Sequence, residues 1–374
     1  MSWSKNHGLL APEGNSLMSY QNYTHERNWG ARLAEYEYRG YSIVAMENQF
    51  LRVVIAAGKG TDILEFQYKP LDVDFMWRSY TGLPPHSSPT ISNPSGSFLD
   101  FYAGGWQEML PNAGMNCVYK GASLGVHGEV CLLPWSYRID RNSPEAVSVT
   151  FSVRTVRTPF YLEKTLTLNH HSPVLFIEER LLNEGDEPMD VMWGHHPAFG
   201  WPFVDDGCRL FLPPCRVRTP EDYPAPTSRL EKGQDTNWPF VRGRSGKTID
   251  LSRLPSPEVR SHDLAYLHGM TEGWYAVVNA RVGVGFGLRW DPALFPFLWF
   301  WQVYRGGMGY PWYGNTYTIA LEPVSSFPPT LTEAIKANTQ LTLVPGEERY
   351  TRLLAVAFAG REEVHGIDPE GRVY

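Results

Sequence analysis

Four short stretches combine a histidine or a carboxylate with glycine or proline in an apolar, aromatic neighbourhood. They are FYAGGWQEMLPNAG (101–114), GVHGEV (125–130), WGHHPAFG (193–200) and ALEPVSSFP (320–328). Where a chain turns at the end of a strand, it can aim a side chain into a cleft. Histidine and glutamate are the residue types that most often transfer protons, so these stretches indicate general acid–base chemistry.

Glu322 is the clearest candidate for a perturbed ionisable group. It follows the apolar residues of TIAL and precedes Pro323, which predicts that its carboxylate is at least partly desolvated. Desolvation raises the pKa of a carboxyl group toward values that suit proton transfer. Together with a histidine, whose ordinary pKa lies near neutrality, such a glutamate can exchange protons reversibly with a substrate.

Other interpretations of these residues stay open. A histidine among aromatics can be a hydrogen-bonded packing residue, and Glu322 can be a structural ion-pair partner. Glu129, next to His127, is interpreted as an orienting or a surface residue. A His/carboxylate metal site could be formed by His127, Glu129, one of His195 and His196, and Glu322. No H-x-H or H-x-x-x-H spacing supports that site, so no metal is predicted.

Two glycine-containing motifs suggest nucleotide binding but do not satisfy its requirements. GRSGKT (243–248) lacks the first glycine of a phosphate loop, because that position is Val241. GVGFG (283–287) is not followed by a helical pattern, and its third glycine is misplaced. We interpret GVGFG as a strand with close backbone contacts. There is no GxSxG motif, and no cysteine has a nucleophile-like context.

The elements that must position the candidate residues are mostly strands. In VSVTFSVRTV (147–156), apolar and polar residues alternate almost without fault, which is typical of a half-buried strand. Further strands are predicted at 61–69, 161–168, 174–182, 275–290 and 316–322, and a closing hairpin at 342–359. The best helical pattern is the short LTEAIKA (331–337).

Two segments, 78–97 and 213–247, are predicted to be long loops, which in a compact domain usually have a function or are mobile. Neither resembles a linker, because strand-like sequence resumes on both sides. We therefore predict a single domain over 1–374, with a core at about 40–358. Its predicted class is all-β: a sandwich of large, mostly antiparallel sheets with few short helices.

Composition narrows the function classes. The 374 residues carry a net charge of -7 and no basic stripe, so nucleic-acid binding is not expected. The chain has 13 Trp and 20 Tyr, which suits sheets and clefts that stack against ring-shaped ligands.

The sequence also gives an expectation for the cellular compartment of the protein. FPFLWFWQVY (295–304) is too short to span a bilayer, and the first residues lack the apolar run of a signal peptide. The cysteines have no CxxC spacing, and we expect reduced thiols in a cytoplasmic protein; they are Cys117, Cys131, Cys208 and Cys215.

At the same stretches the sequence resembles the aldose 1-epimerase, or galactose mutarotase-like, superfamily. ENQFLRVVIAAGKGTDILEFQYKPLDVDFMW (47–77) resembles the opening of the family, and GGWQEMLPNAG with GVHGEV resembles the region of its first active-site histidine. WGHHPAFG is similar to the motif of a second histidine, and ALEP to a catalytic Glu-Pro. The order and spacing of these motifs agree with the family pattern from about residue 40 to residue 358. The resemblance implies a β-supersandwich with a cleft over one sheet, and cofactor-independent interconversion of the α and β anomers of an aldose.

The resemblance also implies roles for individual residues. Glu322 matches the general base that takes the proton from the anomeric hydroxyl, and His196 the general acid that protonates the ring oxygen. His127 matches a helper histidine near that oxygen. Asp263 is the best match to a sugar-binding acid, although the neighbouring His262 leaves the register open. The remaining substrate-binding candidates lie close to the motifs and are Trp106, Gln107, Glu108, Asn112 and His195.

Strand geometry separates the paired histidines. Side chains alternate along a strand, so His195 is expected to point to the face opposite His196. Pro197 is expected to block continuation of the ladder and to determine a turn.

The sequence departs from the family pattern in two places. The family has an Asn-Arg motif before the first histidine, where this chain has GWQEMLPNAG, and His-Gly-Gly is replaced by His-Gly-Glu. The sugar is therefore left open; an anionic sugar would need a cationic pocket, for which Arg78 and Arg305 are candidates. The expected partner is a monosaccharide or sugar derivative, and the expected state is a monomer or homodimer. The alternatives are a carbohydrate-binding protein without turnover and a metal-dependent sugar isomerase or lyase.

Overall fold

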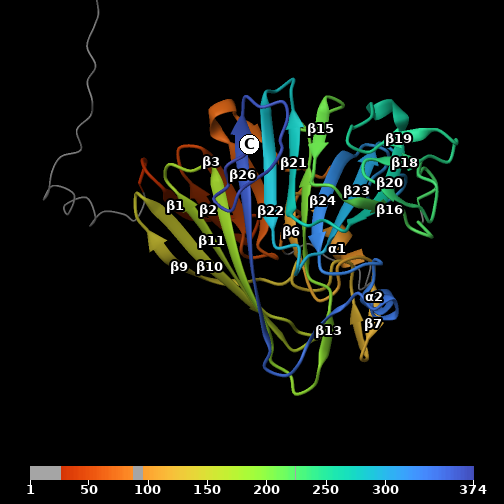
Figure 1. Ribbon diagram of the computed structural model, residues 1–374. Helices are drawn as coiled ribbons and strands as arrows, with labels where there is room; N and C mark the ends of the chain where they lie inside the picture. The colour runs from red at the N-terminus through yellow and green to blue at the C-terminus, as the bar shows by residue number, and fades with distance from the viewer. Residues whose placement is uncertain (1–26, 87–95, 224) are drawn as a thin grey trace, which may run out of the picture.

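The computed structural model describes residues 27–86, 96–223 and 225–374, and strands dominate it (Figure 1). Within these residues the α-helices are α1 (Gly96–Asp100) and α2 (Leu331–Ala337). Helix α2 is the one predicted at 331–337. Its first turn is capped by the Thr330 hydroxyl, which accepts a hydrogen bond from the backbone N–H of Glu333. The described residues contain no helix long and apolar enough to cross a membrane.

The larger sheet has twelve strands, and its central members carry the candidate residues. Its order is β1-β2-β3-β4-β6-β14-β24-β23-β20-β16-β17, with β5 paired to β4. The bounds are β1 (Arg32–Tyr38), β2 (Tyr41–Glu47), β3 (Leu51–Ala56), β4 (Asp62–Tyr68), β5 (Val73–Asp74), β6 (Trp106–Met109), β14 (Gly194–Phe199), β24 (Tyr317–Val324), β23 (Phe297–Tyr304), β20 (Ser261–His268), β16 (Arg216–Arg218) and β17 (Asp235–Asn237).

The second sheet has eight strands in the order β15-β21-β22-β26-β12-β11-β10-β9. The bounds are β15 (Cys208–Phe211), β21 (Gly273–Asn279), β22 (Val284–Trp290), β26 (Glu348–Ala359), β12 (Val174–Asn183), β11 (Phe160–Asn169), β10 (Ala146–Arg154) and β9 (Ser136–Asn142). Three two-stranded pairs are formed by β7 (Cys117–Tyr119) with β8 (Ala122–Leu124), β13 (Met189–Val191) with β25 (Leu341–Leu343), and β18 (Phe240–Arg242) with β19 (Thr248–Asp250).

The core lies between the two large sheets. Phe286 on β22 of the smaller sheet has its ring centroid 5.3 Å from that of Phe66 on β4 and 4.9 Å from that of Phe199 on β14. These contacts join opposite sheets, as in a sandwich whose inner side chains interdigitate. Along β10 the alternating Val147, Val149, Phe151 and Val153 are buried, as the period-two pattern predicts. The all-β sandwich with few helices is confirmed.

The segment 342–359 does not form the predicted hairpin. Strand β25 pairs with β13, whereas β26 lies in the middle of the eight-stranded sheet, between β12 and β22. Both faces of β26 are covered, because Leu353 and Leu354, which point to opposite faces, are both buried. A long strand that is apolar on both faces is more stable inside a sheet than in a terminal hairpin.

Two other predictions about the chain path need correction. The predicted loop 213–247 contains β16, β17 and β18, which are each three residues long and too short for a period-two signal. The run 275–290 is divided into β21 and β22, with the turn between them ending at Gly283. Of the other predicted loop, 78–97, residues 87–95 lie outside the described part of the chain.

The glycine motifs have structural roles. GVGFG belongs to β22, where a Cβ on Gly285 would lie 2.3 Å from Phe358 Cζ and one on Gly287 would lie 2.5 Å from Ile367 Cδ1. The close approach predicted for this motif is confirmed. GRSGKT covers the turn between β18 and β19 and the start of β19.

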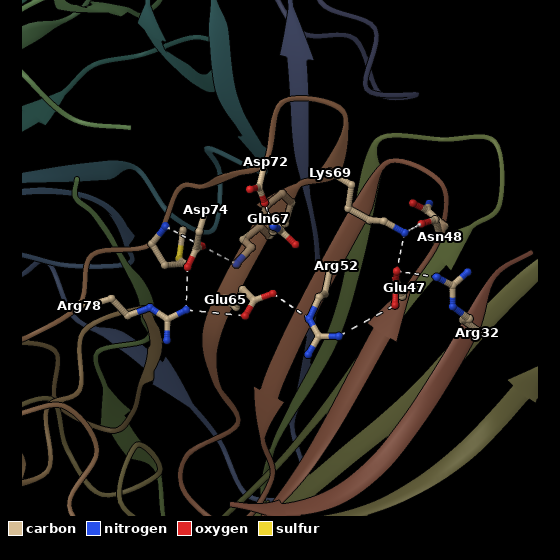
Figure 2. Close-up of polar contacts among 12 residues, drawn as sticks. Arg32, Glu47, Asn48, Arg52, Glu65, Gln67, Lys69, Asp72, Asp74 and Arg78 are labelled. Carbon is tan, nitrogen blue, oxygen red and sulfur yellow. Dashed lines mark hydrogen bonds and ion pairs between the residues drawn. The ribbon is translucent and has the colours of Figure 1, made fainter. Parts of the chain in front are cut away.

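A row of ion pairs crosses β2–β5 on the side away from the core (Figure 2). Arg52 contacts Glu65 at 2.8 Å, and Arg78 contacts Glu65 at 3.7 Å and Asp74 at 2.7 Å. Partly exposed ion pairs of this kind contribute little free energy individually. In this row the guanidinium of Arg78 is already paired with carboxylates.

Candidate active site

A cavity of about 410 Å³ lies over the face of the large sheet that points away from the core. Strands β14, β24, β23 and β20 supply its floor. Its walls come from the end of α1 with Tyr102 and from residues 114–115, 126–127, 222–223, 225–226 and 306–312. This volume and its aromatic lining are typical of a small-molecule site.

One row of side chains across the sheet forms the floor. Tyr266 is the register partner of Trp299, and Trp299 is the register partner of Glu322. His196 is the register partner of Gln107 on its other side. Register partners on antiparallel strands point to the same face. The row therefore carries side chains from four distant parts of the sequence into one line.

His196 and Glu322 face each other across a gap in the ladder between β14 and β24. Gly194 pairs with Val324 and Ala198 with Ala320, which leaves His195–Pro197 opposite Leu321–Pro323. Proline has no N–H to donate to a ladder, and each of the two strands has one next to its ionisable residue. Strand β14 continues through Pro197 to Phe199, so the predicted turn is wrong while the predicted interruption of pairing is present.

The two side chains form a close, buried pair. His196 Nε2 lies 3.5 Å from Glu322 Oε1, and both residues are almost completely buried. The Tyr102 hydroxyl lies 3.4 Å from His196 Nδ1. A hydroxyl can both donate and accept a hydrogen bond. Tyr102 can therefore bond to His196 Nδ1 whether or not this nitrogen carries a proton, while Nε2 faces Glu322.

Burial shifts both members of the pair toward their neutral forms. It raises the pKa of Glu322 well above its usual value of 4.5. Burial, together with the nearby His127, lowers the pKa of His196 well below its usual 6.5. Opposite shifts of two facing groups are a recognised mark of a proton-transfer site.

His127 stands beside this pair. Its Nδ1 contacts the backbone carbonyl of Ala113; because a carbonyl only accepts, Nδ1 carries the proton and Nε2 is left as an acceptor. Its ring centroid is 4.9 Å from that of His196 and 4.4 Å from that of Phe98. Burial lowers the pKa of His127 to about 4, so the ring is neutral near pH 7.

The glycine after His127 is required by the backbone. Gly128 has φ +79, and a Cβ there would lie 2.1 Å from the carbonyl oxygen of Leu110. The next residue, Glu129, points elsewhere: it accepts hydrogen bonds from the N–H groups of Val156 and Arg157 and from the Thr158 hydroxyl. Glu129 therefore orients a turn and does not join a metal site with His127.

The walls of the cavity are aromatic. Trp301 Nε1 donates a hydrogen bond to His262 Nε2 at 2.9 Å, and the Trp301 and Trp312 ring centroids lie 5.3 Å apart. Burial lowers the pKa of His262 to about 4, so His262 is neutral and accepts this bond. Tyr223 packs edge-on against His262. These flat surfaces suit a ring-shaped ligand.

The structure corrects the expectation for Asp263. His262, Leu264 and Tyr266 line the cavity, whereas Asp263 points to the other face of β20. Its carboxylate accepts hydrogen bonds from the Ser228 hydroxyl at 2.9 Å and from Arg229 Nε at 3.0 Å. Asp263 thus fixes residues 228–229 in place, and it is His262 that faces the cavity.

His195 lies in the core, on the face opposite His196, as alternation predicts. Its Nε2 contacts Glu179 Oε2 at 3.1 Å, and its Nδ1 accepts from Trp106 Nε1 at 3.3 Å. Glu108 Oε2 lies 3.2 Å from Lys164 Nζ. This buried polar cluster joins the two sheets, because Glu108 and His195 belong to the large sheet and the other two charged residues to the smaller one.

In this cluster Glu108, Glu179 and His195 each have one potential metal-ligand atom within 4.8 Å of the others. Burial and the nearby Glu108 raise the pKa of Glu179 to about 7. The carboxylates of Glu108 and Glu179 outweigh burial and raise the pKa of His195. The Lys164 ammonium lies against Glu108, so this buried carboxylate already has a cationic partner.

The remaining predicted contacts are also outside the cavity lining. Trp106 and Glu108 belong to the core cluster. Gln107 shares the face of His196, but its amide donates to the Gly104 carbonyl at 2.6 Å. Asn112 donates to the carbonyls of Met115 and Gly125 and accepts from the Leu331 N–H, so it fixes the wall of the cavity.

Sequence reasoning missed several residues of the cavity, among them Tyr102, Tyr223, Trp299 and Trp301. One signal was present. In FLWFWQVY, Trp299 and Trp301 occupy alternate positions and must share a face. Tyr102 was included in a singled-out stretch without a role.

Comparison with solved structures identifies the fold. The chain is similar to a candidate aldose 1-epimerase of Klebsiella pneumoniae, with 15% identity, 88% of each chain covered and a TM-score of 0.65. It is also similar to a galactose mutarotase related enzyme of Lactobacillus acidophilus, with 17% identity, 89% of this chain and 100% of that chain covered, and a TM-score of 0.58. A galactose mutarotase-like protein of Lactobacillus casei is 18% identical, with 84% and 100% covered and a TM-score of 0.54. The galactose mutarotase-like fold expected from the sequence is confirmed.

A family model described as Domain of unknown function (DUF4432) matches residues 38–356. No curated protein matches the chain.

Proposed function

The chain belongs to the family described as Domain of unknown function (DUF4432), and we propose that its cavity interconverts the α and β anomers of a reducing sugar by acid–base ring opening and reclosure. One observation carries the proposal: His196 and Glu322 face each other at 3.5 Å on the floor of an aromatic cavity. The solved structures of the same fold include proteins described as candidate aldose 1-epimerases, which supports the fold and leaves the activity to experiment.

The proposed reaction needs two proton transfers at one carbon atom. A base takes the proton from the anomeric hydroxyl, and an acid protonates the ring oxygen as the C1–O bond of the ring breaks and its electron pair moves to that oxygen. Both oxygens are bonded to C1, so the acid and the base must lie close together. Glu322 as base and His196 as acid meet this requirement, because their side chains lie 3.5 Å apart.

The pair returns to its starting state through the reverse reaction. Ring opening converts a glutamate carboxylate and an imidazolium into a neutral carboxyl and a neutral imidazole. Rotation about C1–C2 and reclosure on the other face return both protons. The pKa directions of Glu322 and His196 favour the neutral pair, which is the state that accompanies the open-chain aldehyde.

Two neighbours can support this exchange. Tyr102 holds His196 at Nδ1 and leaves Nε2 for the substrate. His127 keeps Nε2 as an acceptor because Nδ1 is engaged by Ala113, so it can accept a hydrogen bond from a sugar hydroxyl near the reacting oxygens. The aromatic walls can pack against the C–H faces of a pyranose ring.

The test is anomer exchange of neutral aldoses, measured by NMR exchange spectroscopy against the spontaneous rate. Glu322→Gln and His196→Asn should each lower the enzymatic acceleration by about 10²–10⁴-fold, the usual contribution of general acid–base catalysis. Glu362→Gln and His365→Asn, which change the same residue types at exposed positions, should keep the wild-type rate. The proposal fails if no sugar exchanges faster than in buffer, or if the two floor variants match the controls while all remain folded.

A further inference from the structure

The cavity changes character from its floor to its mouth. Glu322 and His196 on the floor are 2% and 4% exposed. Met115, Met308 and Tyr310 also line the cavity, yet they are 49%, 53% and 50% exposed. These three side chains are therefore the rim, and the apolar surface continues from the proton-transfer pair to solvent.

The cavity is larger than one sugar ring. Its volume of about 410 Å³ would hold roughly 14 waters at about 30 Å³ each. A hexose has twelve non-hydrogen atoms, and bonded atoms lie closer together than hydrogen-bonded waters. A single ring placed at Glu322 would leave the rim uncovered, and apolar surface at a binding site indicates contact with a ligand.

The charges around the cavity oppose an anionic ligand. The lining contains two carboxylates, Glu322 and Asp222, and no Lys or Arg among the residues described by the structure. The nearby ammonium of Lys232 is paired with Asp222 at 2.8 Å, and the Tyr310 hydroxyl donates to the carboxylate of Asp100. A phosphate or carboxylate on the sugar would therefore lack a cationic partner.

Arg78 and Arg305, which the sequence suggested as parts of a cationic pocket, do not add positive charge to the cavity lining. Arg78 pairs with Asp74 and Glu65 in the row of Figure 2. Arg305 lies outside the cavity lining.

We propose that the site takes a neutral reducing sugar of two rings, with its reducing ring over His196 and Glu322 and its second ring against Met115, Met308 and Tyr310. The proposal rests on the function proposed above and adds the charge and the size of the substrate. The rim contacts act far from the reacting carbon, so they contribute binding energy that is equal in the ground state and the transition state.

The experiment compares anomer exchange of maltose, cellobiose and lactose with that of glucose, galactose, glucose 6-phosphate and glucuronate. At least one neutral disaccharide should have a KM about tenfold below that of its parent monosaccharide, corresponding to about 1.4 kcal/mol of added binding. Met308→Ala and Met115→Ala should raise the disaccharide KM several-fold, and by a larger factor than they raise the monosaccharide KM. Val156→Ala, which also truncates an exposed apolar side chain, is the matched control.

The outcomes separate this inference from the proposed function. If monosaccharides exchange as efficiently as every disaccharide, or an anionic sugar is preferred, the inference is wrong while the mutarotase function stands. If no sugar exchanges faster than in buffer, the function is wrong. Titration of the intrinsic tryptophan fluorescence then decides the inference on its own, because tighter binding of a neutral disaccharide than of its parent sugar supports it and equal binding overturns it.

Discussion

His196 and Glu322 occupy facing positions of β14 and β24, at the point where the ladder between these strands is interrupted. The gap removes backbone pairing where the two side chains need room, and strand pairing resumes on either side of it. The His196–Glu322 pair is therefore held by sheet geometry, which positions side chains more accurately than loops do.

The first prediction concerns the pH dependence of anomer exchange. The pair is competent when it holds one exchangeable proton, so kcat/KM should fall at low pH, when His196 binds a second proton, and at high pH, when Glu322 loses the last one. The lowered pKa of His196 places the acid limb below pH 6.5, and the raised pKa of Glu322 places the alkaline limb above pH 4.5.

Exchange NMR at closely spaced pH values, after subtraction of the spontaneous rate, measures this profile. An acid limb centred above pH 6.5 would contradict the assignment of His196 as the group with the lowered pKa.

The second prediction concerns Tyr102. Tyr102→Phe removes the hydroxyl that lies 3.4 Å from His196 Nδ1 and keeps the ring that packs in the cavity wall. Loss of a hydrogen bond worth about 1 kcal/mol should lower kcat roughly five- to tenfold. KM should change little, because the hydroxyl acts through His196.

Tyr275→Phe is the control for this variant, since the buried Tyr275 hydroxyl has no hydrogen-bond partner among the described residues. Equal kcat for the two variants would show that Tyr102 does not orient His196.

The third prediction concerns stability at acid pH. His127 and His262 have folded-state pKa values lowered by burial to about 4, below the value of about 6.5 in an unfolded chain. A group with a lowered folded pKa contributes stability that is present above the unfolded pKa and is lost as the pH falls toward the folded pKa. Stability should therefore fall between about pH 6.5 and pH 4, by on the order of 3 kcal/mol for each histidine.

Urea unfolding of wild type and His127→Gln at pH 7 and pH 4.5 measures this contribution. The variant should lose less stability on acidification than wild type does. An equal loss would mean that His127 is not buried in its neutral form.

The fourth prediction concerns the buried cluster behind the site. Lys164→Met leaves the carboxylate of Glu108 without its ammonium partner in the core. Removing one member of a buried ion pair typically costs about 3–5 kcal/mol. The free energy of unfolding at pH 7 should drop accordingly, and the double variant Lys164→Met/Glu108→Gln should recover part of the loss.

Lys120→Met is the matched control, because Lys120 pairs with Glu187 on the surface. Exposed pairs contribute little, so this variant should unfold close to wild type. A Lys164 variant as stable as the Lys120 variant would mean that the core cluster is not an ion pair.

The sequence by itself predicted several local elements and the desolvation of Glu322. Alternation in 147–156 predicts β10, and the helical pattern at 331–337 predicts α2, because such patterns depend on neighbouring residues alone. The apolar residues before Glu322 predict its desolvation for the same reason, and the structure places it in the floor of the cavity beside His196.

Only the tertiary structure decided which side chains meet. The choice between His262 and Asp263 depends on the register of β20, and a shift of one residue moves a side chain to the opposite face. The partners of β25 and β26 depend on which distant strand offers a matching apolar surface. The floor of the cavity joins Tyr266, Trp299, Glu322 and His196 across four strands. Such a row forms through pairing between residues far apart in the chain, and no local pattern encodes that pairing.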